Sequence, residues 1–350
     1  MKKYLALLLA LLMVFALCAC GSEPAEPAAD DANEPAADDA AEQQYSLGMG
    51  VMINTDSSKE NQAQVDATLA AVVLDGEGKI VSCRLDCVQN KMDVTGGAVD
   101  TAATFKTKME LGDDYNMVAY SDATIEWYDQ AKAFESYVVG KTADEVAGLE
   151  TVVNEEGNQV TTDETLFASC SISIKDFMDA IVKACKDEWA VQFTSDGNFT
   201  LGVAAISDAS ESVAAAADKD ADVKMYSEYA AAVVDANGVI LACLNDATQP
   251  VVNVDMNGAI TGSTVKGTKR ELGDDYNMVA YGNAIAEWDA QSAAFSAYCV
   301  GKTAAEVQAF ETEVNEEGHQ VTTDETLFAS CTMSIGGMMA VIAQAANYAR

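Results

Sequence analysis

Basic side chains are scarce in this chain of 350 residues. Lysine and arginine together number 20, against 56 aspartate and glutamate residues, and the formal net charge is −36. Because the phosphate backbone of a nucleic acid binds to a basic surface, this balance excludes nucleic acid as a partner. The same charge disfavours docking onto anionic lipid headgroups. Attachment to a membrane would therefore have to come from a covalent lipid.

Histidine is almost absent, since His319 is the only one in the chain. A single histidine gives no support to a Ser-His-Asp triad or to a zinc site. The sequence also has no phosphate-binding loop and no dinucleotide fingerprint. We therefore expect a protein that binds no metal and is not itself an enzyme.

Proline is rare too, and three of the four prolines fall within the stretch 20–44. Alanine, glutamate and aspartate dominate this stretch, which has no lysine or arginine. Such a composition buries little apolar area and repels itself. We expect a disordered acidic linker here.

The segment 1–19 has the pattern of an export signal. Lys2 and Lys3 precede an apolar run that is shorter than the roughly 20 residues of a membrane span. The run ends in Leu-Cys-Ala-Cys-Gly, which resembles the lipobox of bacterial lipoproteins and implies a lipid on Cys20. The alternative is an ordinary secretory signal with a coincidental cysteine. Both place the chain outside the cytoplasm, and the lipid would anchor it to the extracellular face of the cytoplasmic membrane.

A long internal repeat is the main feature of the remaining chain. Residues 110–184 return at 271–345, and the longest shared strings are ELGDDYNMVAY, VNEEG and QVTTDETLFASC. A period of this length is a whole domain, not a solenoid unit of roughly 20–50 residues. We predict two tandem copies of one domain, at 45–190 and 191–350.

Each copy has the pattern of an α+β fold, with a small antiparallel sheet packed against helices. Apolar runs around Gly and Asn turns predict a β-hairpin at 69–85 and again at 231–244. Helical spacing of apolar residues predicts a helix at 120–138 and at 281–299, followed by a short helix that starts with a capping box. A strand-like segment then leads to a last helix, which begins near Ile174 and at the matching position of the second copy.

Seven of the nine cysteines follow Cys20, and two pairs of them are matched between the copies. Cys83 matches Cys243, and Cys170 matches Cys331. In an exported protein these suggest one disulfide per domain, Cys83–Cys170 and Cys243–Cys331. The alternative is that all four are small buried residues whose thiols stay reduced.

The strand-like segment 165–173, repeated at 326–334, is the strongest candidate for chemistry. It is rich in small and hydroxyl-bearing residues and ends where the last helix begins. Free amides and the helix dipole at such a point favour a phosphate, and Ser171 or its counterpart Thr332 could carry a phosphate ester. The alternative is that these hydroxyls only cap the helix.

Each copy contains GKIVSC or a variant of it, ELGDDYNM, an EW..Q...F..Y helix and TDETLFASC(S/T)(I/M)SI. With the lipobox and the acidic linker, these motifs resemble a family of Gram-positive lipoproteins that carry covalent FMN and double as pheromone precursors. That family serves flavin-based extracellular electron transfer. The resemblance implies FMN joined through its phosphate to Thr332, with Ser171 at the matching position. It also implies a flavin transferase and a membrane quinol-linked reductase as partners.

Four aromatic residues fit such a flavin site, since their rings could stack on the isoalloxazine: Tyr115, Trp127, Tyr276 and Trp288. Their helical spacing is equally typical of core residues. The alternative function is a non-redox cell-surface lipoprotein, a ligand-binding or envelope-interaction module without flavin. Two departures favour it: the serine at position 171, and the absence of the Ser/Thr-Gly-Ala-Thr string typical of the broader FMN-attached domains.

Overall fold

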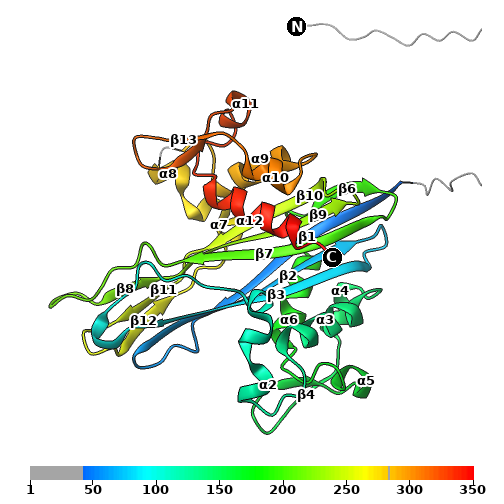
Figure 1. Cartoon of the computed structure of the whole chain (residues 1–350), viewed down its shortest axis with the longest axis horizontal. Coiled ribbons are helices and arrows are strands. Elements are labelled where there is room, and N and C mark those ends of the chain that lie inside the picture. Colours follow the sequence, from blue (N-terminus) through cyan, green and yellow to red (C-terminus); the bar gives the residue numbers. More distant parts are fainter. Residues whose placement is uncertain (1–41, 283) are drawn as a thin grey trace, which may run out of the picture. The chain divides into compact units, whose positions relative to one another are not determined.

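The computed structural model describes residues 42–350 except residue 283 (Figure 1). The predicted signal peptide, the lipidation residue Cys20 and nearly all of the predicted linker lie outside the described residues. The described residues belong to one compact unit of antiparallel sheets and helices. This confirms the mixed class of α and β structure expected from the sequence. None of the described helices is long and apolar enough to cross a membrane.

The first sheet is an antiparallel meander to which one later strand is added, in the order β3-β2-β1-β6. Its strands are β1 (Gln43–Asn54), β2 (Gln62–Leu74), β3 (Ile80–Asp93) and β6 (Val191–Ser195). The predicted hairpin is present, with Val72 opposite Cys83. Its turn needs Gly78, whose φ of 77° is costly for a residue with a side chain. Strands β2 and β3 extend beyond the predicted hairpin, because buried side chains such as Val65 and Met92 continue on them.

The second half of the chain forms two smaller antiparallel sheets, ordered β10-β9-β7 and β12-β11-β8. Their strands are β7 (Phe199–Asp208), β8 (Ala221–Lys224), β9 (Tyr226–Asp235), β10 (Ile240–Thr248), β11 (Val251–Val254) and β12 (Ile260–Thr264). Pro250 separates β10 from β11, because it has no N–H to donate to a ladder. The long strand β3 of the first half therefore has two shorter counterparts here.

The β1–β3 sheet and the β7–β10 sheet share a buried core, and the alternation of side chains divides each strand between two cores. On β2, Leu69 and Ala71 lie in the core shared by the two sheets, whereas Ala70 and Val72 lie in a core beneath the helices. Tyr229 on β9 lies in the shared core as well. Because both faces are buried, these strands have continuous apolar sequences.

The helices of the two halves lie on opposite sides of these strands (Figure 1). In the first half they are α1 (Lys108–Leu111), α2 (Met117–Tyr120), α3 (Trp127–Val138), α4 (Ala143–Ala147), α5 (Glu164–Phe167) and α6 (Lys175–Cys185). In the second half they are α7 (Lys269–Leu272), α8 (Met278–Gly282), α9 (Trp288–Cys299), α10 (Ala304–Gln308), α11 (Glu325–Phe328) and α12 (Gly336–Asn347). Two short hairpins complete the fold, β4 (Thr151–Val153) with β5 (Gln159–Thr161) and β13 (Thr312–Val314) with β14 (Gln320–Thr322). The predicted capping boxes at Thr142 and Thr303 begin α4 and α10.

Two predicted elements differ from the structure. The helix predicted at 120–138 begins only at Trp127, because Glu126 is extended and its carboxylate accepts hydrogen bonds from two amides of the separate turn α2. The segment 165–173 is not strand-like, since it starts in the helical turn α5, which the Asp163 side chain caps, and continues without regular secondary structure. Both differences recur in the second half.

The last helix of each half lies directly on a strand. A Cβ atom on Gly48 of β1 would stand 2.1 Å from the carbonyl oxygen of Ala184 in α6. A Cβ atom on Gly202 of β7 would stand 2.0 Å from the carbonyl oxygen of Ala345 in α12. Only glycine permits this approach, so these two glycines set the position of both helices.

Reciprocal polar contacts join the two halves at these helices. Lys183 of α6 forms an ion pair with Glu271 of α7, and Gln344 of α12 donates a hydrogen bond to Glu110 of α1. Residues that follow the two helices form further ion pairs with the other half, Asp187 with Arg270 of α7 and Arg350 with Glu135 of α3. The last helix of each half therefore contacts α1 or α7, the first helix of the other half.

Candidate functional site

A buried glutamine holds the predicted attachment segment in each half. The Oε1 atom of Gln291 in α9 accepts hydrogen bonds from the amides of Thr332, at 2.9 Å, and Met333, at 3.3 Å. Its amide nitrogen donates to a backbone carbonyl just before α9. Gln130 holds Ser171 in the same way in the first half. The two segments thus share one local structure.

These hydrogen bonds contradict the expectation that free amides at this segment bind a phosphate. The amides at 332 and 333 already have a protein partner, so they are not open donors for a phosphate. The alternative, that Thr332 caps the last helix, is also wrong, because the N-cap of α12 is Ile335 and no side chain caps it. The Thr332 hydroxyl makes only a long hydrogen bond of 3.4 Å to Gln291.

A cleft of about 960 Å³ lies beside Thr332. Three residues predicted from the sequence line it together: Thr332, Trp288 and Tyr276. Trp288 is also part of the helix-covered core, with only 5% of its surface exposed. Trp288 is therefore a core residue and at the same time part of the wall of the cleft, and its stacking on a flavin stays a prediction. The volume lies within the range of roughly 300–1,000 Å³ that small-molecule sites occupy.

Lys269, the first residue of α7, stands among the rings of this cleft. Its ammonium nitrogen lies 4.9 Å from the ring centre of Tyr226, 4.9 Å from that of Tyr276 and 5.4 Å from that of Trp288. Only 8% of the residue is exposed, and this burial lowers the pKa of Lys269 to about 8. A positive charge held against aromatic faces is stabilised by their quadrupoles.

Glu228 on β9 is the acidic partner of this group. The Tyr226 hydroxyl donates to its Oε1 atom at 3.1 Å, while its Oε2 atom is buried without a hydrogen-bond partner. A Cβ atom on Gly337 would stand 2.4 Å from Oε1, so the carboxylate packs against the first turn of α12. Burial raises the pKa of Glu228 above its usual value.

The first half repeats only part of this arrangement. The ammonium of Lys108 lies 4.8 Å from the ring centre of Tyr115 and 5.3 Å from that of Trp127. Where the second half has Tyr226 and Glu228, however, the first has Asp66 and Thr68. The structure brings Tyr115 and Trp127 together around a lysine, as it does their counterparts.

Sequence reasoning missed Lys269, Glu228 and Tyr226. A signal for the lysine was present, because Lys108 and Lys269 are matched in a chain that is poor in lysine. No such signal marked Glu228 and Tyr226, since the repeat does not retain them. A comparison between the two copies finds only the residues that both retain. It misses residues that are present at one of the two sites alone.

Apart from Lys269 and His319, the charged side chains that line the cleft are acidic. Besides Glu228, its lining includes five further carboxylates, namely Asp208, Glu211, Glu313, Glu316 and Glu317. His319 also lines it and lies 3.8 Å from Glu317. No group of three or more His, Cys, Asp or Glu side chains placed to hold a metal ion occurs in the part of the chain that the structure describes.

The cysteines of the proposed disulfides are free thiols in the structure. Cys83 and Cys170 are buried in the core of the first half, and Cys243 and Cys331 in that of the second. All seven cysteines that the structure describes are free thiols, so neither the Cys83–Cys170 nor the Cys243–Cys331 bond is formed there, and these four are small buried core residues. Burial raises the pKa of Cys170 to about 12 and that of Cys331 to about 11.

Comparison with known proteins gives one partial match. No family model and no solved structure matches the chain. The chain is 32% identical to a chlorophenol reductase of Desulfitobacterium hafniense over an alignment of 116 residues. The alignment covers 28% of the chain and 36% of that reductase, so the chain spans little more than a third of the reductase's length.

Proposed function

We propose that this chain is a lipid-anchored carrier of covalent FMN on the extracellular face of the cytoplasmic membrane. The flavin is joined through its phosphate to Thr332 and occupies the cleft of the second half. A separate flavin transferase installs it, so the chain itself is not an enzyme. Electrons arrive from a membrane quinol-linked reductase and leave to an extracellular acceptor.

The observation that carries the proposal is the composition of the cleft. One wall presents a threonine hydroxyl at the position that the resemblance implies for attachment. Among the carboxylates that line the rest of the cleft stand aromatic rings and a lysine, which suit a flat ring system that becomes negatively charged on reduction. The volume of about 960 Å³ is sufficient for a ligand of this class.

Bound FMN would supply the transfer of one or two electrons, and the protein supplies position and environment. Gln291 holds the backbone at Thr332, so the attachment residue stays at the cleft. Trp288 and Tyr276 form part of the wall of the cleft. Lys269 places a positive charge beside these rings, and this charge would stabilise a bound flavin that becomes negatively charged on reduction.

Covalent attachment also fits the electrostatics of the cleft. Free FMN carries a doubly charged phosphate, and the carboxylates that line the cleft would repel it. The amides of Thr332 and Met333, which could have offset this repulsion, already donate to Gln291. An ester bond to Thr332 keeps the flavin in place without an anion-binding site.

We also propose that the two halves are tandem copies of one domain. The glutamine clamp on residue 171 or 332 recurs in both, as does the lysine between a tyrosine and a tryptophan. A capping box with the same hydrogen bonds starts both α1 and α7. Ser171 takes the place of the attachment threonine in the first copy, and we expect it to remain unmodified.

The proposal is tested by expressing the full chain together with a flavin transferase. The intact mass should increase by one FMN less one water, on the peptide that contains Thr332. Thr332→Ala should abolish the increase, whereas the exposed Thr326→Ala six residues earlier should leave it unchanged. Unmodified protein without yellow colour refutes the carrier function.

A second candidate is a non-redox binding module of the cell surface. The acidic lining of the cleft favours it, because six carboxylates around aromatic rings suit a cationic or neutral organic ligand. In this case the purified chain should bind a quaternary ammonium probe such as choline, and Glu228→Gln should weaken the binding. The FMN-loaded chain should not bind such a probe at all.

A further inference from the structure

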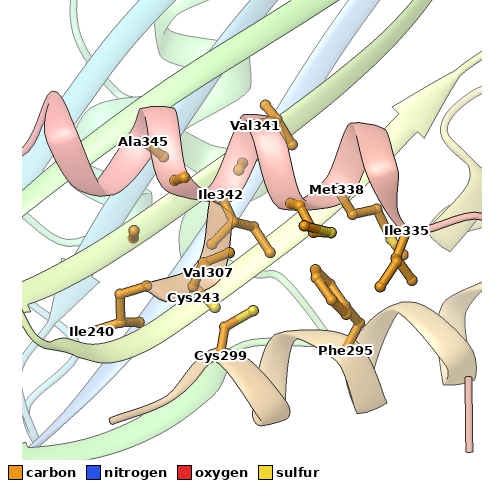
Figure 2. Packing of buried hydrophobic residues seen from close by; sticks show 14 of the residues in the cluster. Ile240, Cys243, Phe295, Cys299, Val307, Ile335, Met338, Val341, Ile342 and Ala345 are labelled. Atoms are coloured by element: carbon orange, nitrogen blue, oxygen red, sulfur yellow. The ribbon is translucent and has the colours of Figure 1, made fainter. Parts of the chain in front are cut away.

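Three cysteines of the second half share one core: Cys243 on β10, Cys299 at the end of α9, and Cys331. All three have at most 1% of their surface exposed. Figure 2 shows Cys243 and Cys299 in this core, and their thiols are near enough to interact. The sequence repeat had paired Cys243 with Cys331 instead, because only these two have counterparts in the first half.

A hydrogen bond places Cys243 against the last turn of α9. Its thiol donates to the carbonyl oxygen of Ser296 at 3.3 Å. Ser296 precedes Cys299 by three residues, and positions three apart lie on the same face of a helix. The Cys299 side chain therefore projects from the face that Cys243 touches. The nearby Cys243 thiol, together with burial, raises the pKa of Cys299 far above its usual value.

We propose that Cys243 and Cys299 form a disulfide when the chain folds in an oxidising compartment. The oxidant is a small or protein disulfide. One cysteine thiolate attacks it, forms a mixed disulfide and releases one thiol of the oxidant. The second cysteine then displaces the other thiol. Two electrons and two protons pass to the oxidant, whose S–S bond is broken as the new one forms.

The bond forms during folding rather than afterwards. In the closed core both thiols are protonated and shielded, and a protonated thiol is a poor nucleophile. During folding, β10 and α9 meet before the surrounding side chains exclude the oxidant. Reduction of the finished protein should be slow for the same reason.

The first half provides an internal control. Cys83 stands at the position of Cys243, but Val138 stands at the position of Cys299. In the first half, therefore, no cysteine of the helix faces the strand cysteine. The disulfide is specific to the half with the cleft, where it ties down the helix whose first turns carry Trp288 and Gln291. The inference does not depend on bound flavin.

The test is refolding of the full, reduced chain in a buffer of oxidised and reduced glutathione. Free thiols are then alkylated, and the peptides are mapped by mass spectrometry without reduction. A cross-linked peptide of Cys243 with Cys299 is expected, with Cys83 and Cys331 alkylated. Alkylated Cys243, or a cross-link to Cys331, overturns the proposal.

Two variants keep the test independent of folding defects. Cys299→Val introduces the residue of the first half and should leave Cys243 alkylated. Cys331→Ala should retain the cross-link. The oxidised wild-type chain should also unfold at a higher denaturant concentration than the reduced chain, and Cys299→Val should show no such difference. A difference of equal size in that variant would contradict the assignment.

Discussion

Asp86 and its counterpart Asp246 are buried carboxylates that hold the start of α1 and α7, next to the lysines of the two ring clusters. The Oδ1 atom of Asp86 accepts hydrogen bonds from the amides of Cys87, at 2.7 Å, and Met109, at 3.1 Å. Burial raises the pKa of Asp86 to about 7 and that of Asp246 to about 6. We expect both residues to make the stability of the fold depend on pH.

The direction in which stability changes with pH follows from proton linkage. A carboxyl with a raised pKa keeps its proton longer in the folded than in the unfolded chain, so it stabilises the fold at low pH. This contribution is lost as the pH rises through the folded pKa. Each pH unit between the unfolded and folded pKa costs about 1.4 kcal/mol. From about pH 5 to about pH 8, Asp86 should therefore cost about 3 kcal/mol of unfolding free energy, and Asp246 about half of that.

The assay is urea denaturation of the wild type and of Asp86→Asn at several pH values. Asparagine has the same size and retains an oxygen acceptor for the two amides, but it does not titrate. Relative to the wild type, the variant should gain about 3 kcal/mol between about pH 5 and pH 8. The exposed Asp129→Asn is the control and should follow the wild type. Parallel curves for Asp86→Asn and the wild type would show that Asp86 titrates normally in the fold.

Three further changes test the site and the packing. Ser171→Thr should add a second flavin to the chain co-expressed with a transferase, and an unchanged intact mass would contradict the equivalence of the two positions. Gln291→Leu removes the acceptor of the Thr332 amide, whose hydrogen exchange should become roughly 10- to 100-fold faster; equal rates would mean that this bond gives no protection. Gly202→Ala should lower the unfolding free energy by about 1–3 kcal/mol, because its Cβ atom would stand 2.0 Å from a carbonyl of α12. Gly76→Ala, where nothing lies within 4 Å, should change it little.

The elements that could be predicted from the sequence are those with local causes. The capping boxes at Thr142 and Thr303 and the hairpin turn at Gly78 all depend on residues within a few positions of each other. The start of α3 could not be predicted in this way. Glu126 ends the helical pattern by binding the amides of a turn eight or nine residues earlier, and no periodicity reports such a contact.

The candidate site was predicted in part. Thr332, Trp288 and Tyr276 were selected because they are matched or similar in both copies, and the structure places them around one cleft. Glu228 was not selected, because its counterpart is Thr68 and it lies before the apolar run from which the strand was predicted. Its role depends on the position of α12 above β9, which the sequence of either element does not show.

The sequence by itself determined the repeat, the class of fold, the excess of negative charge and the local turns and caps. Each of these follows from composition or from contacts between near neighbours in the chain. The tertiary structure decided which amides are occupied at Thr332, which thiol faces Cys243 and which groups surround Lys269. These arrangements join residues that lie tens of positions apart, and only the packing of helices onto the two facing sheets brings them within contact distance.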